Sequence, residues 1–119
     1  MPRVLVVDDE AGVRASIRMV LRGEYDVVGA ESVDAALRAL AASRVDLVLL
    51  DLVMPGRDGF ELLEELARRK EAPPVIVLTA TRAGDAAGRA LALGATECMR
   101  KPFEVDELRA RVRELAKAR

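Results

Sequence analysis

Five polar side chains stand where short hydrophobic segments of the chain end: Asp8, Asp9, Asp51, Thr79 and Lys101. Three carboxylates held close together repel one another and raise one another's pKa unless a cation neutralises them. Their ligand atoms are hard oxygens and the chain has no histidine, so they favour Mg²⁺, or Mn²⁺, over zinc or copper. A carboxylate beside such an ion, an ammonium group and a hydroxyl is suited to phosphoryl transfer, in which Asp can be the acceptor.

Alternating strands and helices must bring these side chains together. Short, mostly apolar runs predict five strands, at about residues 4–7, 25–30, 45–51, 75–79 and 96–100. Apolar residues at helical spacing predict five helices, at about residues 13–21, 36–41, 60–67, 84–93 and 103–115. This alternation is typical of an α/β fold with a doubly wound, five-stranded parallel sheet and helices on both faces. We expect the flavodoxin-like strand order 2-1-3-4-5.

In that order the ends of strands 1 and 3 are neighbours, so Asp8 and Asp9 should meet Asp51 at the carboxyl edge of the sheet. Thr79 and Lys101 end strands 4 and 5 at the same edge. A single Asp at a strand end is often only a turn residue. Polar residues gathered at one edge of an otherwise apolar sheet are harder to explain in that way, so we interpret them as a functional site.

Local signals mark several helix ends. Ser32 is a candidate N-cap for the second helix, and Asp58 with Glu61 matches a capping box at the start of the third. Gly23 and Gly94 suit the C-terminal ends of the first and fourth helices. The fourth helix contains two glycines of its own and an apolar face made mostly of alanine, so we expect it to be the least stable helix.

Composition excludes several classes of function. With 19 Lys and Arg against 20 Asp and Glu, the net charge of −1 gives no electrostatic footprint for nucleic acid or membrane. One cysteine excludes an internal disulfide and a cysteine metal cluster, and the lack of histidine excludes a histidine base, metal ligand or phosphodonor. The start of the chain lacks a signal-peptide layout, and no apolar run is long enough to span a bilayer. We therefore expect a cytoplasmic protein.

The motifs closely resemble those of the receiver domain of two-component response regulators in bacteria. The matching segments are VVDDE at 6–10, DLVMPGRDG at 51–59, LTA at 78–80, GA at 94–95 and KPF at 101–103. The resemblance covers essentially the whole chain. It implies one receiver domain over residues 1–119, with no output domain in this chain.

The resemblance also implies roles for individual residues. Asp51 would accept a phosphoryl group from a phosphohistidine on a sensor histidine kinase or a histidine phosphotransfer protein. Mg²⁺ or Mn²⁺ would be bound by Asp9, Asp51 and the backbone carbonyl of Val53, and by Asp8 mainly through water. The protein would then be a phosphoacceptor switch rather than an enzyme, limited to Mg²⁺-dependent self-phosphorylation and slow autodephosphorylation.

The remaining site residues would contact the phosphoryl group itself. Lys101 would pair with its oxygens, Thr79 would donate its hydroxyl to them, and the small side chain of Ala80 would leave room. In the family the bond between Lys101 and Pro102 is typically cis. Residues 84–119 would form the surface that changes on phosphorylation and through which two copies could form a homodimer.

Three positions distinguish this chain within the family pattern, namely Cys98, Val53 and Thr81. The family couples movement of the Thr79 position to rotation of an aromatic ring three residues before the lysine, where this chain has Cys98. We therefore expect signalling to depend on movement of the helix at 84–93. Val53 and Thr81 flank the phosphoryl group, and neither can orient water as a carboxylate or amide would, which predicts a long phosphoryl lifetime.

Three alternatives stay open at this point. An Asp-nucleophile phosphatase of the haloacid dehalogenase type would need an Asp-x-Asp pattern and a cap domain, and Asp8-Asp9 lacks that spacing. A receiver-like interaction or dimerisation module that works without phosphorylation would fit the absence of the ring. Cys98 could also be a redox sensor, although thiols within an apolar strand tend to be inert.

Overall fold

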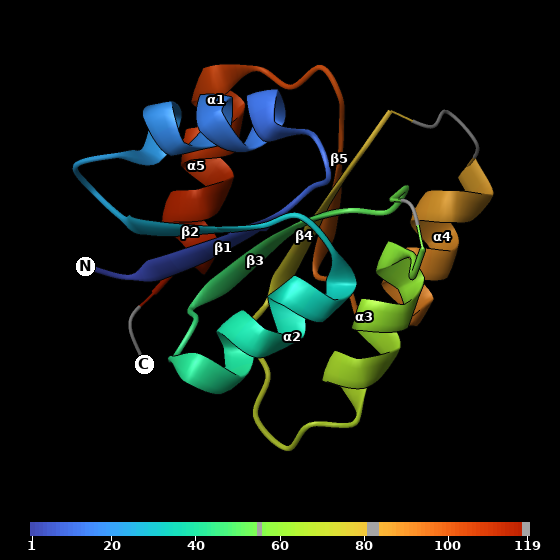
Figure 1. The fold of residues 1–119 in the computed structure, drawn as a ribbon. Coiled ribbons are helices and arrows are strands. Elements are labelled where there is room, and N and C mark those ends of the chain that lie inside the picture. Colours follow the sequence, from blue (N-terminus) through green and yellow to red (C-terminus); the bar gives the residue numbers. More distant parts are fainter. Residues whose placement is uncertain (55, 81–83, 118–119) are drawn as a thin grey trace.

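A five-stranded parallel sheet forms the centre of the protein (Figure 1). The computed structural model describes residues 1–54, 56–80 and 84–117. Its strands follow the predicted spatial order β2-β1-β3-β4-β5, and neighbouring strands are parallel. Their bounds are β1 Arg3–Val7, β2 Asp26–Ala30, β3 Leu47–Asp51, β4 Val75–Thr79 and β5 Glu97–Arg100. The predicted α/β fold class is therefore confirmed.

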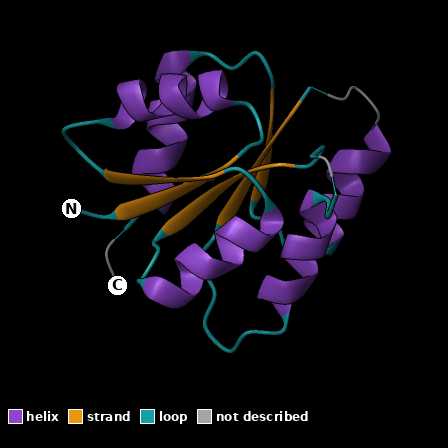
Figure 2. Ribbon diagram, in the orientation of Figure 1, coloured by secondary structure: helices purple, strands orange, loops and turns teal. Residues whose placement is uncertain are grey.

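In the part of the chain that the structure describes, five helices cover the sheet in two layers (Figure 2). Their bounds are α1 Ala11–Leu21, α2 Val33–Ala42, α3 Gly59–Ala67, α4 Gly84–Ala92 and α5 Val105–Leu115. α1 and α5 lie on one face, while α2, α3 and α4 lie on the other (Figure 1). Among the described residues, none of these helices has the length and apolar character needed to cross a bilayer.

Alternation along the strands divides the buried side chains into two cores, because successive residues of a strand point to opposite faces of the sheet. In β3, Val48 and Leu50 pack beneath α2 and α3, whereas Leu47 and Leu49 pack beneath α1 and α5. The same alternation occurs in β1 and β4, which are almost completely buried. A fully buried Leu contributes about 1.5–3 kcal/mol relative to an exposed one. Strands buried on both faces thus provide a rigid support for the residues at their ends.

The predicted helix ends are largely present. The Ser32 hydroxyl accepts a hydrogen bond from the Ala35 backbone N–H at 3.1 Å, and the Asp58 carboxylate accepts one from the Glu61 N–H at 3.2 Å. The Glu61 carboxylate accepts a bond from the Arg57 guanidinium at 2.7 Å instead of closing a reciprocal capping box. Gly23 and Gly94 follow their helices with φ angles of 92° and 109°, in the region that favours glycine.

The segment after β5 differs from the prediction. The last helix begins at Val105 rather than at Phe103, because Glu104 has an extended backbone and occupies the N-cap position. Phe103 still packs against the core beneath α1 and α5. The bond between Lys101 and Pro102 is cis. β2 and β5 each start one residue later than predicted, at Asp26 and Glu97.

Candidate metal centre

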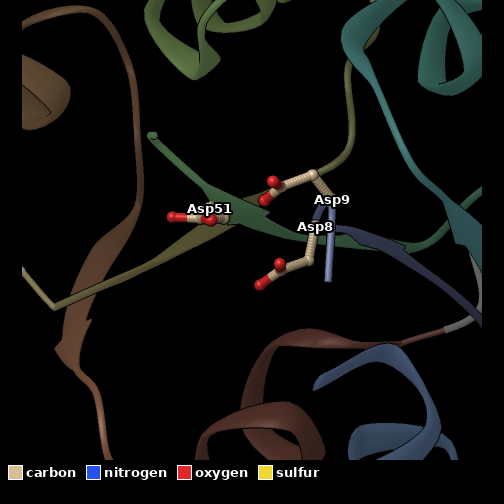
Figure 3. A group of neighbouring side chains, drawn as sticks. All are labelled: Asp8, Asp9 and Asp51. Carbon is tan, nitrogen blue, oxygen red and sulfur yellow. The ribbon is translucent and has the colours of Figure 1, made fainter. Parts of the chain in front are cut away.

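Three aspartates meet where β1 and β3 end (Figure 3). Val7 of β1 is in register with Leu50 of β3, so the residues that follow them are brought side by side. One carboxylate oxygen from each of Asp8, Asp9 and Asp51 lies within 4.8 Å of the other two. Asp8 and Asp51 are buried, and Asp9 is exposed. The sequence-based expectation that two neighbouring strand ends bring these carboxylates together agrees with this geometry.

Hydrogen bonds fix the turn that follows β1. The Asp8 carboxylate accepts a bond from the Glu10 N–H at 2.9 Å, and the Asp8 N–H donates to the Ala30 carbonyl of β2 at 3.0 Å. The Arg14 guanidinium of α1 donates to the Asp8 backbone carbonyl at 2.7 Å. Asp8 is therefore held through its amide, its carbonyl and its carboxylate, which leaves little freedom for the neighbouring Asp9 backbone.

Asp51 lies at the end of the most buried strand of the sheet, with 7% of its surface exposed. Burial raises the pKa of its carboxyl group, since a charge in an apolar surrounding loses hydration. The hydrogen bond from the Val53 N–H at 3.2 Å and the charge of Lys101 oppose this rise, while the charges of Asp8 and Asp9 add to it. The sequence predicted a raised pKa from carboxylate repulsion, but burial is the larger cause.

Lys101 provides the positive charge of the site. Its ammonium group lies 2.7 Å from Asp8 Oδ2 and 3.7 Å from Asp51 Oδ2, and its backbone N–H bonds to the Thr79 carbonyl at 2.9 Å. Burial alone would lower the pKa of Lys101, but the hydrogen bond to Asp8 and the charges of Asp51 and Asp8 outweigh it and raise the pKa. With its carboxylates ionised, the group of three aspartates and one ammonium keeps a net charge of −2.

Three other predicted site residues, Thr79, Ala80 and Val53, lie at or just beyond the ends of β4 and β3. Thr79 is buried at the end of β4, and Ala80, which follows it, is exposed. Val53 is the second residue after β3, and 67% of its surface is exposed. Thr81 lies outside the described residues. A groove of about 520 Å³ opens beside Lys101 and Ala80, and its other lining residues are Gly12, Val13, Ser16, Pro102 and Phe103.

Cys98 lies in β5, away from the carboxylates. Its side chain is half-buried, and its thiol contacts the Ala87 carbonyl of α4 at 3.7 Å. Burial raises the pKa of the thiol, which disfavours the reactive thiolate. This environment speaks against the redox-sensor alternative.

Sequence reasoning missed two arginines that support the site. Arg14 of α1 is one of them, and it binds the Asp8 backbone. Arg57, in the loop after β3, donates to Asp34 of α2 at 2.8 Å and to Glu61 of α3 at 2.7 Å. The position of Arg57 within the segment 51–59 was visible in the sequence, but its distant partner Asp34 was not.

The donor set fits a hard divalent cation. Carboxylate and carbonyl oxygens suit Mg²⁺, Mn²⁺ or Ca²⁺ better than softer transition metals. The carboxylates of Asp8 and Asp51 are buried, so their charge is poorly hydrated, and the net charge of −2 would be neutralised by one divalent ion. The site therefore has the ligand chemistry, the proximity and the charge that such an ion requires.

Comparisons with known proteins agree with this interpretation. The family model described as "Response regulator receiver domain" matches residues 4–113. The transcriptional regulatory protein ResD of Bacillus subtilis is 41% identical over 95% of this chain and 47% of its own length. The KDP operon transcriptional regulatory protein KdpE of Escherichia coli is 40% identical over 95% of this chain and 50% of its own. The chain thus spans about half the length of these curated relatives.

A solved structure provides a comparison of the fold. The response regulator protein TrrA from Thermotoga maritima, in complex with Mg(2+)-BeF, superimposes with a TM-score of 0.86 at 35% identity, over 97% of this chain and 99% of that one. Both the sequence and the backbone of the present chain therefore match the same family along nearly their whole length.

Proposed function

Because the chain belongs to the response regulator receiver domains of two-component signal transduction, we propose that Asp51 is its phosphoacceptor and that phosphorylation switches the surface formed by α4, β5 and α5. The donor would be a phosphohistidine on a sensor histidine kinase or a histidine phosphotransfer protein. The observation that supports this most directly is the approach of Asp8, Asp9 and Asp51 to within 4.8 Å, with the Lys101 ammonium beside them.

The transfer step follows from the chemistry of a carboxylate. One oxygen of ionised Asp51 attacks the phosphorus atom, an O–P bond forms and the P–N bond to the donor imidazole breaks. The electron pair of that bond stays on the imidazole nitrogen, which is protonated from solvent. In the return reaction water attacks the phosphorus, releases inorganic phosphate and restores the carboxylate.

Asp9, Asp51 and the backbone carbonyl of Val53 would hold Mg²⁺ or Mn²⁺, with Asp8 acting through water. When bound, the ion neutralises charge on the carboxylates and on the phosphoryl oxygens. Lys101 has the reach to pair with a phosphoryl oxygen, because its ammonium is already 3.7 Å from the Asp51 carboxylate. Thr79 would donate its hydroxyl to the phosphoryl group, and Ala80 would leave space for it.

Incubation with acetyl phosphate and Mg²⁺ tests this proposal. We expect a mass increase of one phosphoryl group that survives acid, is lost in base and is absent from the Asp51→Asn variant. Asp46→Asn is the matched control, because Asp46 is a buried aspartate that directly precedes β3 at the opposite edge of the sheet. Equal labelling of Asp51→Asn and the unaltered protein would contradict the assignment of the phosphoacceptor.

Transmission of the signal should depend on α4. In the family an aromatic ring would fill the position of Cys98, whereas here the thiol contacts the Ala87 backbone directly. We propose that α4 moves as a unit in response to phosphorylation, since no ring separates it from β5 at this point. Hydrogen exchange of residues 86–92 should change when beryllofluoride and Mg²⁺ are added. Equal protection in both states would contradict this mechanism.

An interaction module that works without phosphorylation is not favoured, because it would not need buried like charges at one edge of the sheet. The partners of a phosphorylated form are also proposals. ResD and KdpE carry names of transcriptional regulators, so control of transcription through a longer protein is one expected output. A homodimer through α4, β5 and α5 is another, and the domain itself is expected to bind neither nucleic acid nor membrane.

A further inference from the structure

Gly59 approaches the backbone of the proposed phosphoacceptor strand more closely than any other residue type could. It is the first residue of α3 and is buried. A Cβ atom at this position would lie 2.7 Å from the Asp51 carbonyl oxygen and 2.8 Å from the Leu52 Cα. Both contacts are with backbone atoms, so neither can be relieved by rotation of a side chain. Either the start of α3 or the end of β3 would have to move.

The displacement can be sized from these contacts. Ordinary van der Waals contact begins at 3.4 Å, so a Cβ at 2.7 Å from the Asp51 oxygen requires a retreat of about 0.7 Å. The helix is not free to provide it, because Leu62 and Leu63 are buried against the sheet one turn later. The strand is held as well, since Asp51 is in register with Leu78 of β4.

Because both elements resist movement, the shift is concentrated where they join the loop between them, at Leu52 and Gly59. A hydrogen bond of 3.0 Å from the Gly59 N–H to the Leu52 carbonyl closes this loop at its base. Within it, the Val53 N–H bonds to the Asp51 carboxylate, and the Val53 carbonyl is a proposed metal ligand. A shift at the base therefore changes the relative position of two proposed ligands, the Asp51 carboxylate and the Val53 carbonyl.

We propose that Gly59 is a positioning residue of the metal centre, which keeps the Asp51 carboxylate and the Val53 carbonyl at the separation that a divalent ion requires. This inference rests on the proposed function. Mg²⁺ requires nearly octahedral geometry with oxygens at about 2.0–2.1 Å, and metal sites tolerate deviations of about 0.2 Å. A retreat of about 0.7 Å at the base of the loop is several times that tolerance, so only part of it has to reach the two ligand oxygens.

The φ angle of Gly59 lies outside the left-handed region, so an alanine would not be strained by its backbone conformation. Backbone strain therefore does not contribute to the effect of Gly59→Ala, and the effect of any Gly→Ala change on the unfolded chain is matched by a control. Gly88→Ala is the matched control. Gly88 also lies in a helix and is exposed, and a Cβ there has nothing within 4 Å. Both variants add one methyl group to a helical glycine, but only one adds it against the site.

The test is a titration with Mg²⁺ followed by amide NMR, together with thermal unfolding in the absence of metal. We expect Gly59→Ala to raise the Mg²⁺ dissociation constant at least about tenfold, and Gly88→Ala to leave it unchanged. Before any metal is added, the amide signals of Leu52 and Val53 should move in Gly59→Ala and stay in place in Gly88→Ala. Unfolding curves identify the temperature range in which each variant is folded, and affinities are compared there.

Each result of this titration either supports or overturns the role of Gly59 as a positioning residue. If Gly59→Ala is less stable but binds Mg²⁺ as the unaltered protein does, Gly59 is only a packing residue and the inference is wrong. If Gly59→Ala does not fold at any temperature, the Gly59 amide of the unaltered protein provides the second measurement. That signal should shift with the same Mg²⁺ midpoint as Val53, and an unperturbed Gly59 amide would overturn the inference.

The two proposals also fail separately. Mg²⁺ binding without phosphorylation of Asp51 would contradict the proposed function. The Mg²⁺ affinities of Gly59→Ala and Gly88→Ala would still decide whether Gly59 positions the metal ligands. If the unaltered protein bound no Mg²⁺, both would be overturned.

Discussion

Lys101→Met is the perturbation that tests the charge balance of the site. Methionine keeps most of the length of the side chain and removes only the ammonium group, which lies 2.7 Å from Asp8 and 3.7 Å from Asp51. Without metal, two buried carboxylates would lose their nearest positive charge. Removing one partner of a buried ion pair costs about 3–5 kcal/mol. Because Asp8 keeps its hydrogen bond from the Glu10 N–H, we expect Lys101→Met to lower the free energy of unfolding by about 3 kcal/mol, at the lower end of this range.

Metal affinity should change in the opposite direction. In the unaltered protein a divalent ion must compete with the Lys101 ammonium for the Asp8 carboxylate. A hydrogen bond between charged groups contributes about 1.5–3 kcal/mol, and a tenfold change in affinity corresponds to about 1.4 kcal/mol. The variant should therefore bind Mg²⁺ about tenfold more tightly. At 100 times the dissociation constant, Mg²⁺ stabilises a folded protein by about 2.7 kcal/mol, which would restore most of the lost stability.

Urea denaturation at a series of Mg²⁺ concentrations measures both quantities in one experiment. Lys70→Met is the matched control, because Lys70 is exposed and lies at the opposite edge of the sheet, in the segment between α3 and β4. Its stability and its Mg²⁺ dependence should equal those of the unaltered protein. A Lys101→Met variant with unchanged or weaker Mg²⁺ binding would refute the idea that the ammonium and the metal compete for the same carboxylates.

Three further predictions concern Asp51, Cys98 and Val53. Burial raises the folded-state pKa of Asp51. The protonated carboxyl group therefore stabilises the fold below the unfolded pKa of 3.8, and this contribution is lost as the pH rises through the folded pKa. Metal-free Asp51→Asn should accordingly be more stable than the unaltered protein at pH 7, with a difference that shrinks towards pH 4 in urea denaturation; a constant difference would contradict this. Burial also raises the pKa of the Cys98 thiol, so the pH midpoint of its alkylation by iodoacetamide should exceed that of the urea-unfolded chain, and equal midpoints would count against it. Finally, Val53→Asn should shorten the lifetime of the phosphorylated protein several-fold in a phosphate-release assay, because an exposed amide there can orient water; an unchanged lifetime would show that this position does not control hydrolysis.

The strands could be predicted because their apolar residues favour a strand locally and are also buried on both faces of the sheet in the fold. Runs such as 47–50 are apolar at every position, which is typical of a short strand buried on both faces, and each ends at a polar residue. The start of the last helix was not predictable in this way. Phe103 is apolar and precedes Leu108, Val112 and Leu115, which are at helical spacing, yet it packs half-buried against the core from the loop before α5. An apolar side chain indicates that a residue is buried. Burial alone does not show whether that residue lies in a helix or in the segment before it.

The site was predictable to the level of which side chains meet, since parallel strands place their ends at one edge. Which of these side chains form ion pairs with one another could not be predicted. Lys101 lies closer to Asp8 than to Asp51, and this depends on the path of a single side chain. The approach of Gly59 to the Asp51 backbone depends on the distance between a helix and the sheet, for which the sequence has no periodic signal. The glycine itself was visible only as a turn residue.

The sheet that supports the site also determines the direction in which it can act. Apolar strands bury Asp51 and raise its pKa, so its negative charge is less stable there than in water and is favoured by nearby cations. A phosphoryl group would add further negative charge at the same point, and the groups available to meet it, Thr79 and Lys101, lie at the ends of β4 and β5. β2 lies beyond β1 on the other side of β3 and contributes none of the predicted site residues. The electrostatic response to phosphorylation should therefore be transmitted towards β4, β5 and the helices α4 and α5 that follow them.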